Sequence, residues 1–398
     1  MHRRHFLRTG GAAAVSMALG GCAPGLLAQS GRRRPLVTVY PVNASWDRVI
    51  RTTVGLRPNR ASGFVVKPER FDDKTVIHNY GHGGAGMSLS WGTSHLAAEL
   101  ALAHTERRAA VIGSGIVGLT AARQLQRRGF DVTIYAKSLP PETTSNKSWA
   151  AFTPTSGLAS QRTPEWDAQF RRVVEIAYRE HQLHVGRGYG VGWIHSYSPT
   201  NSAGTGGGGG GGEDGLLPAS VNLGTVILEE GEHPFNTRYA RHSPYLKFEP
   251  SIYLEALMRD VLDFGGEIVV RSFDSPRDFM ALPEQLIVNC TGLGAKDIFG
   301  DEELTPVKGQ LVFLVPQPEV DYSMGGMLPR SDGIALGHVQ QRGEWSLEVD
   351  HDERIRVMEN AMRTFGAIPQ PPGGIPPLRM ATTVAAAPPV ERFFGLES

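Results

Sequence analysis

The residues with the clearest chemical meaning form a glycine-rich loop, Gly113-Ser114-Gly115-Ile116-Val117-Gly118. The spacing G-x-G-x-x-G is typical of loops that approach the pyrophosphate of a dinucleotide. Gly113 permits a tight turn, Gly115 lets the backbone come close to the phosphates, and Gly118 lets the next helix pack tightly on the preceding strand. We therefore predict a dinucleotide site at the start of that helix, whose N-terminus faces negative charge.

The elements around the loop must hold it in place. Residues 109–112 are a short apolar strand, residues 116–128 predict a helix with one apolar face, and residues 131–135 read as the next strand. This strand, loop, helix and strand fit within about 30 residues, as a nucleotide-binding unit requires. The spacing alone is a weak signal, and a chance glycine-rich turn is the alternative. The flanking elements favour dinucleotide binding.

The position that would bind the adenosine ribose does not decide which dinucleotide is the cofactor. A carboxylate is usual at the end of the second strand, but Tyr135-Ala136-Lys137 stands there. A basic residue could instead accept a 2′-phosphate and would then indicate NADP. The loop alone does not decide between the cofactors.

Five other segments resemble one family. They are Gly55-Leu56-Arg57-Pro58, the run from His78 to Gly86 (HNYGHGGAG), Thr143-Thr144-Ser145, Asn289-Cys290-Thr291-Gly292 and Lys308-Gly309-Gln310. Together with the loop they resemble the D-amino-acid oxidase family of FAD enzymes, over roughly residues 49–365 and only loosely over 160–250. The resemblance implies FAD as cofactor and an α/β (α+β overall) fold, with a Rossmann-like FAD-binding domain and a mixed-sheet substrate-binding domain.

The order of these segments differs from that of the family. There the Arg-Pro and His-Gly-Gly segments close the chain, whereas here they precede the glycine loop. The order resembles a circular permutation, in which the polar link Thr105 to Arg108 joins the former ends and the new ends fall between Phe365 and Val49. An assembly of mismatched gene fragments is the alternative, but every required segment occurs once.

The expected domain boundaries follow from this alignment. We expect a signal with a lipobox at 1–30, a linker at 31–48, FAD-binding parts at 49–160 and 251–305, and substrate-binding parts at 161–250 and 306–367. A glycine-rich loop at 204–212 interrupts the first substrate-binding part, and 368–398 is an irregular tail. Helices are expected at 89–104 and 253–264, a strand at 49–54, and antiparallel strands at 308–315 and 333–346.

The resemblance also implies which residues hold the cofactor. Gly83, Gly84, Ala85, Gly86, Met87 and Ser88 would run beside the flavin, Thr143, Thr144 and Ser145 would donate to phosphate or ribose oxygens, and Thr291 and Gly292 would line the adenosine side. His78 and His82, four residues apart, could suggest a metal site. The glycines between them prevent a stable helix and no third ligand is near, so we expect structural histidines and no metal.

The catalytic roles are implied in the same way. Arg57 matches the arginine that grips the substrate carboxylate, because a planar guanidinium fits a carboxylate at two points; a surface ion pair is its alternative role. The carbonyl of Gly84 would face the substrate amine. Tyr322 matches a lid tyrosine, although an ordinary half-buried aromatic is the alternative. The second tyrosine of the family is replaced by Gly326, which removes a hydroxyl and would leave room for a bulkier substrate.

The first 30 residues indicate export. Arg3-Arg4-His5-Phe6-Leu7 is a twin-arginine sequence, a weakly apolar run follows, and Leu19-Gly20-Gly21-Cys22 resembles a bacterial lipobox. We expect twin-arginine export to the periplasm or cell envelope and lipid anchoring at Cys22, the one expected link to a membrane. An ordinary secretory signal with Cys22 lost is the alternative. The twin-arginine route carries folded proteins, which suits a cofactor inserted before export.

Charge and chemistry complete the expectation. With 40 basic and 40 acidic residues and no basic stripe, nucleic acid is not an expected partner. The resemblance implies oxidative deamination of D-amino acids by hydride transfer from the α-carbon to the flavin, giving an imino acid, then keto acid and ammonia. Oxygen, yielding hydrogen peroxide, or another electron acceptor would reoxidise the flavin. The alternatives are a glycine or N-methyl amino acid oxidase or dehydrogenase of the same fold, and a non-catalytic flavin- or amino-acid-binding lipoprotein.

Overall fold

The computed structural model describes residues 36–157, 159–204, 214–221, 223–337 and 340–372. These residues belong to one unit, which begins at Leu36. The predicted signal with Arg3, Arg4 and Cys22, residues 205–212 of the glycine-rich loop and the tail beyond residue 372 lie outside the described residues. In the described part of the chain, no helix is both long enough and apolar enough to cross a bilayer.

One mixed sheet carries the glycine loop. Its strand order is β2-β3-β10-β4-β5-β9, and β2 pairs antiparallel to β3 while the other neighbours are parallel. Parallel strands are covered on both faces, which explains the continuous apolar run at 109–112. The strands are β2 (Val65–Phe71), β3 (Lys74–Tyr80), β4 (Arg108–Ile112), β5 (Asp131–Ala136), β9 (Glu267–Val270) and β10 (Leu286–Asn289).

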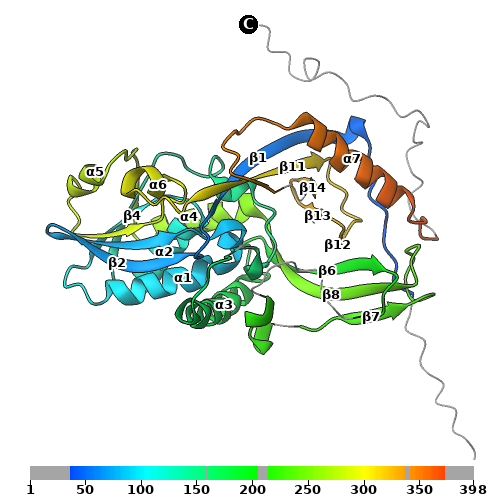
Figure 1. Ribbon diagram of the computed structural model, residues 1–398, viewed down its shortest axis with the longest axis horizontal. Helices are drawn as coiled ribbons and strands as arrows, with labels where there is room; N and C mark the ends of the chain where they lie inside the picture. Colours follow the sequence, from blue (N-terminus) through cyan, green and yellow to red (C-terminus); the bar gives the residue numbers. More distant parts are fainter. Residues whose placement is uncertain (1–35, 158, 205–213, 222, 338–339, 373–398) are drawn as a thin grey trace, which may run out of the picture. The chain divides into compact units, whose positions relative to one another are not determined.

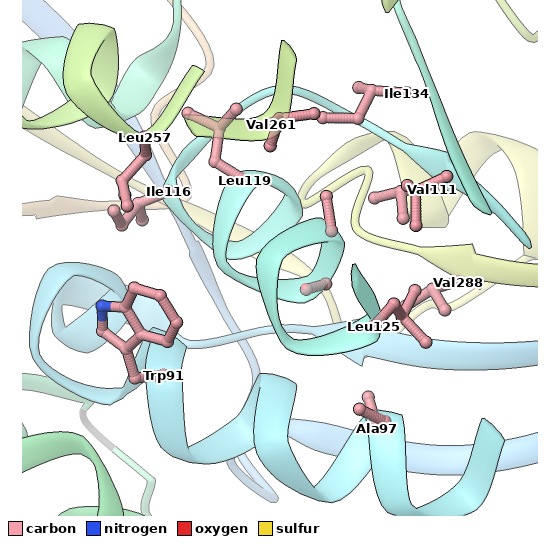
Figure 2. Close-up of a cluster of buried hydrophobic side chains, with 14 of the residues drawn as sticks. Trp91, Ala97, Val111, Ile116, Leu119, Leu125, Ile134, Leu257, Val261 and Val288 are labelled. Atoms are coloured by element: carbon pink, nitrogen blue, oxygen red, sulfur yellow. The ribbon is translucent and has the colours of Figure 1, made fainter. Parts of the chain in front are cut away.

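Helices cover this sheet on both faces. The apolar face of α2 packs between the strands and α4, where Leu119 and Leu125 contact a cluster that includes Val111, Val261 and Val288 (Figure 2). Full burial of such a side chain stabilises the fold by about 1.5–3 kcal/mol. The helices are α1 (Gly86–Ala101), α2 (Ile116–Gln126), α3 (Pro164–His184), α4 (Pro250–Asp263), α5 (Pro276–Met280) and α6 (Gly294–Phe299).

A second, nine-stranded sheet has the order β1-β11-β14-β13-β12-β6-β8-β7, with β15 beside β11. Helix α7 (His351–Gly366) lies across β11 and β14 (Figure 1). The strands are β1 (Val49–Asn59), β6 (Val191–Thr200), β7 (Val226–Glu229), β8 (Tyr239–Phe248), β11 (Thr305–Leu314), β12 (Tyr322–Met324), β13 (Met327–Arg330), β14 (Gly333–Gly337) and β15 (Gln341–Arg342). The short helices are η1 (Trp46–Arg48), η2 (Gly83–Ala85), η3 (Thr144–Lys147), η4 (Pro154–Gly157), η5 (Asp214–Leu216) and η6 (Ala219–Val221).

The segment upstream of the glycine loop belongs to both sheets. Strand β1 pairs with β11 over ten register positions, and β3 inserts beside β10 in the first sheet. Helix α1 then packs against α2 and α3. Residues 49–101 therefore contribute strands to both the nucleotide-binding sheet and the second sheet.

Most predicted elements are confirmed, with shifted ends. The predicted α/β class is confirmed by two mixed sheets, and the helices expected at 89–104 and 253–264 are α1 and α4. Two expectations are wrong. Residues 333–346 do not form one strand, because β14 ends at Gly337 and the two-residue β15 is followed by a turn at Gly343. The linker expected at 31–48 is packed into the fold over its described part, because Val39, Val42 and Ala44 are buried in one cluster with residues of α7.

Candidate active site

The glycine loop has the geometry that dinucleotide binding requires. Gly113 has a φ of 110°, and its amide donates to the carbonyl of Tyr135 at 2.8 Å. A Cβ on Gly118 would lie 1.8 Å from the Gly113 carbonyl oxygen, so only glycine lets α2 start this close to β4. Gly115 immediately precedes α2, and a Cβ there would be 3.2 Å from the hydroxyl of Ser145. The glycine loop therefore places backbone without side chains next to the amides at the N-terminus of α2.

The predicted phosphate-binding hydroxyls lie beside this loop, and they differ in their hydrogen-bond partners within the protein. Ser145 Oγ accepts from the amide of Ile116 at 3.0 Å, and it stands at the N-terminus of α2. Ser114 Oγ instead donates to the carbonyl of Ser138 at 2.6 Å. Thr143 is buried and its hydroxyl donates to Asn146 Oδ1, whereas Thr144 is exposed. Of the predicted hydroxyls, those of Thr144 and Ser145 are therefore best placed to reach a phosphate.

The predicted flavin segment, Gly83 to Ser88, forms η2 and the first turn of α1. A Cβ on Gly84 would lie 2.7 Å from the Ser156 carbonyl oxygen and 3.4 Å from Arg57 Cδ. A Cβ on Gly86 would be 3.8 Å from Ile116 Cγ2, so the N-termini of α1 and α2 lie side by side. Met87 and Ser88 are buried, and Ser88 Oγ is bonded within the protein. These last two residues can meet a cofactor through the backbone only.

Arg57 stands on β1 where the facing strand has no side chain. Gly55 and Gly309 face each other across β1 and β11, and Arg57 is two residues further along the same face. A Cβ on Gly309 would lie 2.7 Å from Arg57 Nη2 and 2.8 Å from Cζ, so the guanidinium rests on the bare backbone of β11. Burial lowers the pKa of Arg57, and its Nη1 lies 3.5 Å from the carbonyl oxygen of Lys308. Arg57, which is predicted to bind the substrate carboxylate, therefore lies next to Gly84 of the predicted flavin segment.

Asn289 connects the predicted adenosine side to His78. The amide and the hydroxyl of Thr291 both donate to Asn289 Oδ1, at 3.2 and 2.8 Å. Asn289 Nδ2 lies 3.1 Å from His78 Nδ1, and His78 Nε2 lies 3.0 Å from Glu69. His82 bonds to Thr93 Oγ1 at 2.9 Å. Both histidines thus have protein partners, and the described residues contain no group of three or more side chains placed to hold a metal.

Two predictions about the substrate pocket are wrong. Tyr322 lies in strand β12, is 1% exposed, and donates its hydroxyl to the carbonyl of Tyr40 at 3.0 Å. A buried strand residue bonded to a neighbouring segment does not act as a lid. Gly326 has a φ of 81°, and a Cβ there would lie 2.5 Å from the Gly337 carbonyl oxygen. This backbone conformation does not accommodate a tyrosine, so the glycine is required by the turn.

A small cavity elsewhere does not compete with this site. It has a volume of about 230 Å³ and lies against β2 and β3, lined by Arg60, Val65, Lys67, Glu69, His78, Tyr80, Phe299 and Asp301. Arg60 pairs with Asp301 at 2.8 Å and with Glu303, and Tyr80 donates to Asp301 at 2.9 Å. Arg60 is thus engaged in ion pairs within the fold.

Several residues of the site carried no signal in the sequence. Ser156 and Gly157 pack directly against the flavin segment. A Cβ on Gly83 would lie only 2.3 Å from the Gly157 carbonyl oxygen. Asn59 Nδ2 also donates to that carbonyl at 2.9 Å. Gly309 was recognised only as part of a motif. Its role depends on the register of β1 and β11, which joins residues about 250 positions apart.

The fold and the glycine cradle define a dinucleotide-binding α/β protein, and comparison with known proteins gives its family. The family described as DAO, FAD dependent oxidoreductase, matches residues 108–386, more than half of the chain. The chain is 26% identical over 255 residues to the D-amino-acid oxidase of Rubrobacter xylanophilus, a match covering 61% of this chain and 72% of that protein. It is 26% identical over 269 residues to human D-aspartate oxidase, covering 63% and 74%. A solved structure, glycine oxidase from Geobacillus kaustophilus, is 15% identical and covers 65% of this chain and 78% of that one, with a TM-score of 0.49.

The chain belongs to the DAO family of FAD-dependent oxidoreductases. It is an oxidoreductase similar to amino-acid oxidases, and its cofactor is FAD. The residues present fit that group. The close approach at Gly118, the bare Gly115 and the hydroxyls at the α2 N-terminus suit a pyrophosphate. The absence of side chains at Gly84 and Gly309 lets the flavin segment and β11 come close to Arg57.

His82 immediately precedes the flavin segment, and its burial makes the free energy of unfolding depend on pH. It is 3% exposed and burial lowers its pKa from 6.5 to about 3. The unfolded chain therefore binds a proton below pH 6.5 that the folded chain does not. Stability should fall as pH drops from 6.5 toward 3, by about 1.4 kcal/mol per pH unit from this residue. Denaturant unfolding of the apoprotein at pH 8, 6 and 5 measures this.

The variant His82→Gln keeps a partner for Thr93 and cannot titrate. We expect its unfolding free energy to fall less steeply between pH 6 and 5 than that of the wild type, with the two curves parallel above pH 7. Equal slopes in both proteins at low pH would show that His82 is not kept neutral.

Proposed function

We propose that this protein oxidises D-amino acids at the α-carbon, giving an imino acid that water converts to the keto acid and ammonia. The observation that supports this most is the position of Arg57, whose guanidinium rests on Gly309 and whose Cδ lies next to Gly84. The names of the relatives, D-amino-acid oxidase and D-aspartate oxidase, agree with it. Glycine and N-methylated amino acids are the competing substrates.

Each residue has a definite task in this reaction. Arg57 grips the substrate carboxylate with two N–H groups, which fixes the α-carbon in place. The Gly84 carbonyl accepts a hydrogen bond from the amine and so orients its lone pair and α-hydrogen. When bound, FAD would supply the electron sink for the hydride, with oxygen or another acceptor as the final oxidant. The protein needs no acid or base triad, because the amine binds as the neutral base after losing its proton to solvent, and loss of a hydride from the α-carbon then gives the protonated imino acid.

Anaerobic bleaching tests the reaction. The mature protein loaded with FAD should lose its visible flavin absorbance when a D-amino acid such as D-alanine is added, and keep it with L-alanine. Glycine and N-methylglycine form further arms of the experiment. Bleaching by N-methylglycine or glycine but not by D-alanine would reassign the substrate. A loaded protein that none of these compounds bleaches would contradict amino-acid oxidation.

Substitution of Arg57 tests the carboxylate grip. Arg57→Lys keeps the charge and loses the two-point geometry, so KM should rise about ten- to a hundredfold, as expected for one lost charged hydrogen bond. Arg57→Ala should raise it further. Arg60→Lys is the matched control, since Arg60 is tied to Asp301; it should lower the melting temperature and leave KM within about twofold. An unchanged KM in Arg57→Lys would remove Arg57 from the site.

We further propose that the chain is a circular permutation of the family fold. The family match begins at residue 108, whereas the upstream strands β1 and β3 complete both sheets. Residues 102–107 connect α1 directly to β4. The described ends meet in one apolar cluster, where Val39 and Val42 pack with Met358 and Phe365. In addition, the Arg354 guanidinium lies 5.4 Å from the Trp46 ring centroid.

A rearranged chain tests this proposal. It would consist of residues 106–398, a Gly/Ser linker and residues 31–105, so that every strand keeps its neighbours. We expect it to bind FAD and to melt within a few degrees of the chain 31–398 in natural order. Apart from the linker the two proteins contain the same residues, so the chain in natural order is the control. An insoluble or FAD-free product would contradict a permuted fold.

We also propose export by the twin-arginine route with lipid anchoring at Cys22. Support comes from Arg3, Arg4 and the lipobox-like Leu19 to Cys22. In a bacterial host, replacing Arg3 and Arg4 by Lys should keep the protein in the cytoplasm. Cys22→Ser should still be exported but leave the membrane fraction. Export of the double-Lys variant, or membrane retention of Cys22→Ser, would contradict the respective step.

A further inference from the structure

A buried chain of hydrogen bonds connects three helices and ends on the flavin segment. Trp91 Nε1 lies 2.6 Å from Tyr253 Oη, Tyr253 Oη lies 3.2 Å from His181 Nδ1, and His181 Nε2 lies 3.2 Å from the carbonyl oxygen of Ser88. Trp91, Tyr253 and His181 are 0% exposed and Ser88 is 1% exposed. Trp91 and Ser88 belong to α1, His181 to α3 and Tyr253 to α4. Figure 2 shows the Trp91 ring near Ile116, with which it shares a core cluster at the start of α2.

The chemistry of the four groups fixes the direction of this chain. An indole N–H can only donate and a carbonyl oxygen can only accept. The Tyr253 oxygen therefore accepts from Trp91, and His181 carries its proton on Nε2 to donate to Ser88. Nδ1 of the neutral ring is then an acceptor, and the Tyr253 O–H donates to it. Burial supports this state, because it lowers the pKa of His181 to about 3, with a smaller contribution from His184.

The chain ends at the residue that holds the first turn of α1. Ser88 Oγ donates to the carbonyl of Ala151 at 3.3 Å and accepts from the amide of Thr153 at 2.8 Å. His181 thus grips the backbone of the same residue whose side chain binds the segment after η3. Two residues before Ser88, Gly86 lies against Ile116, and Gly84 lies against Arg57. A shift of this turn would move both neighbours of the cofactor.

We propose that His181 is a positioning residue for FAD, acting through the carbonyl of Ser88 to hold the first turn of α1 in its binding position. This rests on the proposed placement of the flavin beside Gly83 to Ser88. Helical amides at that turn carry the positive end of the α1 dipole. Their distance from the ring therefore affects both the affinity for FAD and the electronic environment of the flavin. His181 itself does not touch the cofactor.

Three variants of the full mature chain test the proposal. His181→Leu removes the bond to Ser88, His181→Gln can restore a donor to Ser88 and an acceptor for Tyr253, and His184→Leu is the matched control. His184 is also buried on α3, but lies 3.5 Å from Tyr253 Oη and has no hydrogen bond to Ser88. The measurements are the Kd of the apoprotein for FAD, the visible absorbance maxima of the bound flavin, and the melting temperature of the apoprotein.

We expect His181→Leu to bind FAD about tenfold more weakly, the factor that corresponds to one lost hydrogen bond, and with shifted absorbance maxima. His181→Gln should recover most of the affinity and the wild-type maxima. His184→Leu should lose stability but keep both flavin properties. If the His181→Leu variant does not fold, Tyr253→Phe replaces it. That substitution removes the hydroxyl that fixes the tautomer, and it should weaken FAD binding in the same direction.

The proposal is overturned if His181→Leu, or Tyr253→Phe in its place, loses stability yet keeps the wild-type Kd and spectrum. It is equally overturned if the His184 control changes both as strongly. A wild-type protein that binds FAD but oxidises no amino acid would contradict the proposed reaction alone, because affinity and absorbance still report on His181. Failure of the two proposals is therefore distinguishable.

Discussion

The approach of one backbone to another, without side chains between them, is the constraint on which this site depends. At Gly118 a single methyl group would overlap the Gly113 carbonyl, and at Gly309 it would displace the Arg57 guanidinium. The first contact sets the start of α2 against β4 and hence the place of the phosphates. The second lets the Arg57 guanidinium lie on the backbone of β11 while the Cδ of the same side chain lies next to Gly84. The glycines thus determine where the charges stand.

This constraint explains which parts of the site the sequence predicts. The glycine loop is local, so its spacing reports its geometry, and α2 and β4 follow within a few residues. Arg57 was found through its neighbours Gly55 and Pro58, which resemble a family segment. Two contacts of the site join segments that are far apart in the sequence. Gly309 supports Arg57, and Ser156 supports Gly84. No periodicity within either segment contains that information.

The errors have the same physical origin. The resemblance to the family assigns Tyr322 to a lid, but the residue lies in strand β12, where its hydroxyl donates to the carbonyl of Tyr40. Gly326 was interpreted as a lost hydroxyl, whereas the turn between β12 and β13 requires its positive φ. His181 was not singled out, because a histidine inside a helix has no local signature. Only the packing of α1, α3 and α4 shows that its ring reaches Ser88.

The central claim is that the segment upstream of the glycine loop completes the FAD site of the domain that follows it. A crystal structure of the mature chain with FAD bound tests this most directly. We predict the pyrophosphate at the N-terminus of α2, and the flavin ring in van der Waals contact with Gly84 and within reach of a substrate held by Arg57. A flavin ring that lies away from both Gly83–Ser88 and β1 would contradict the account.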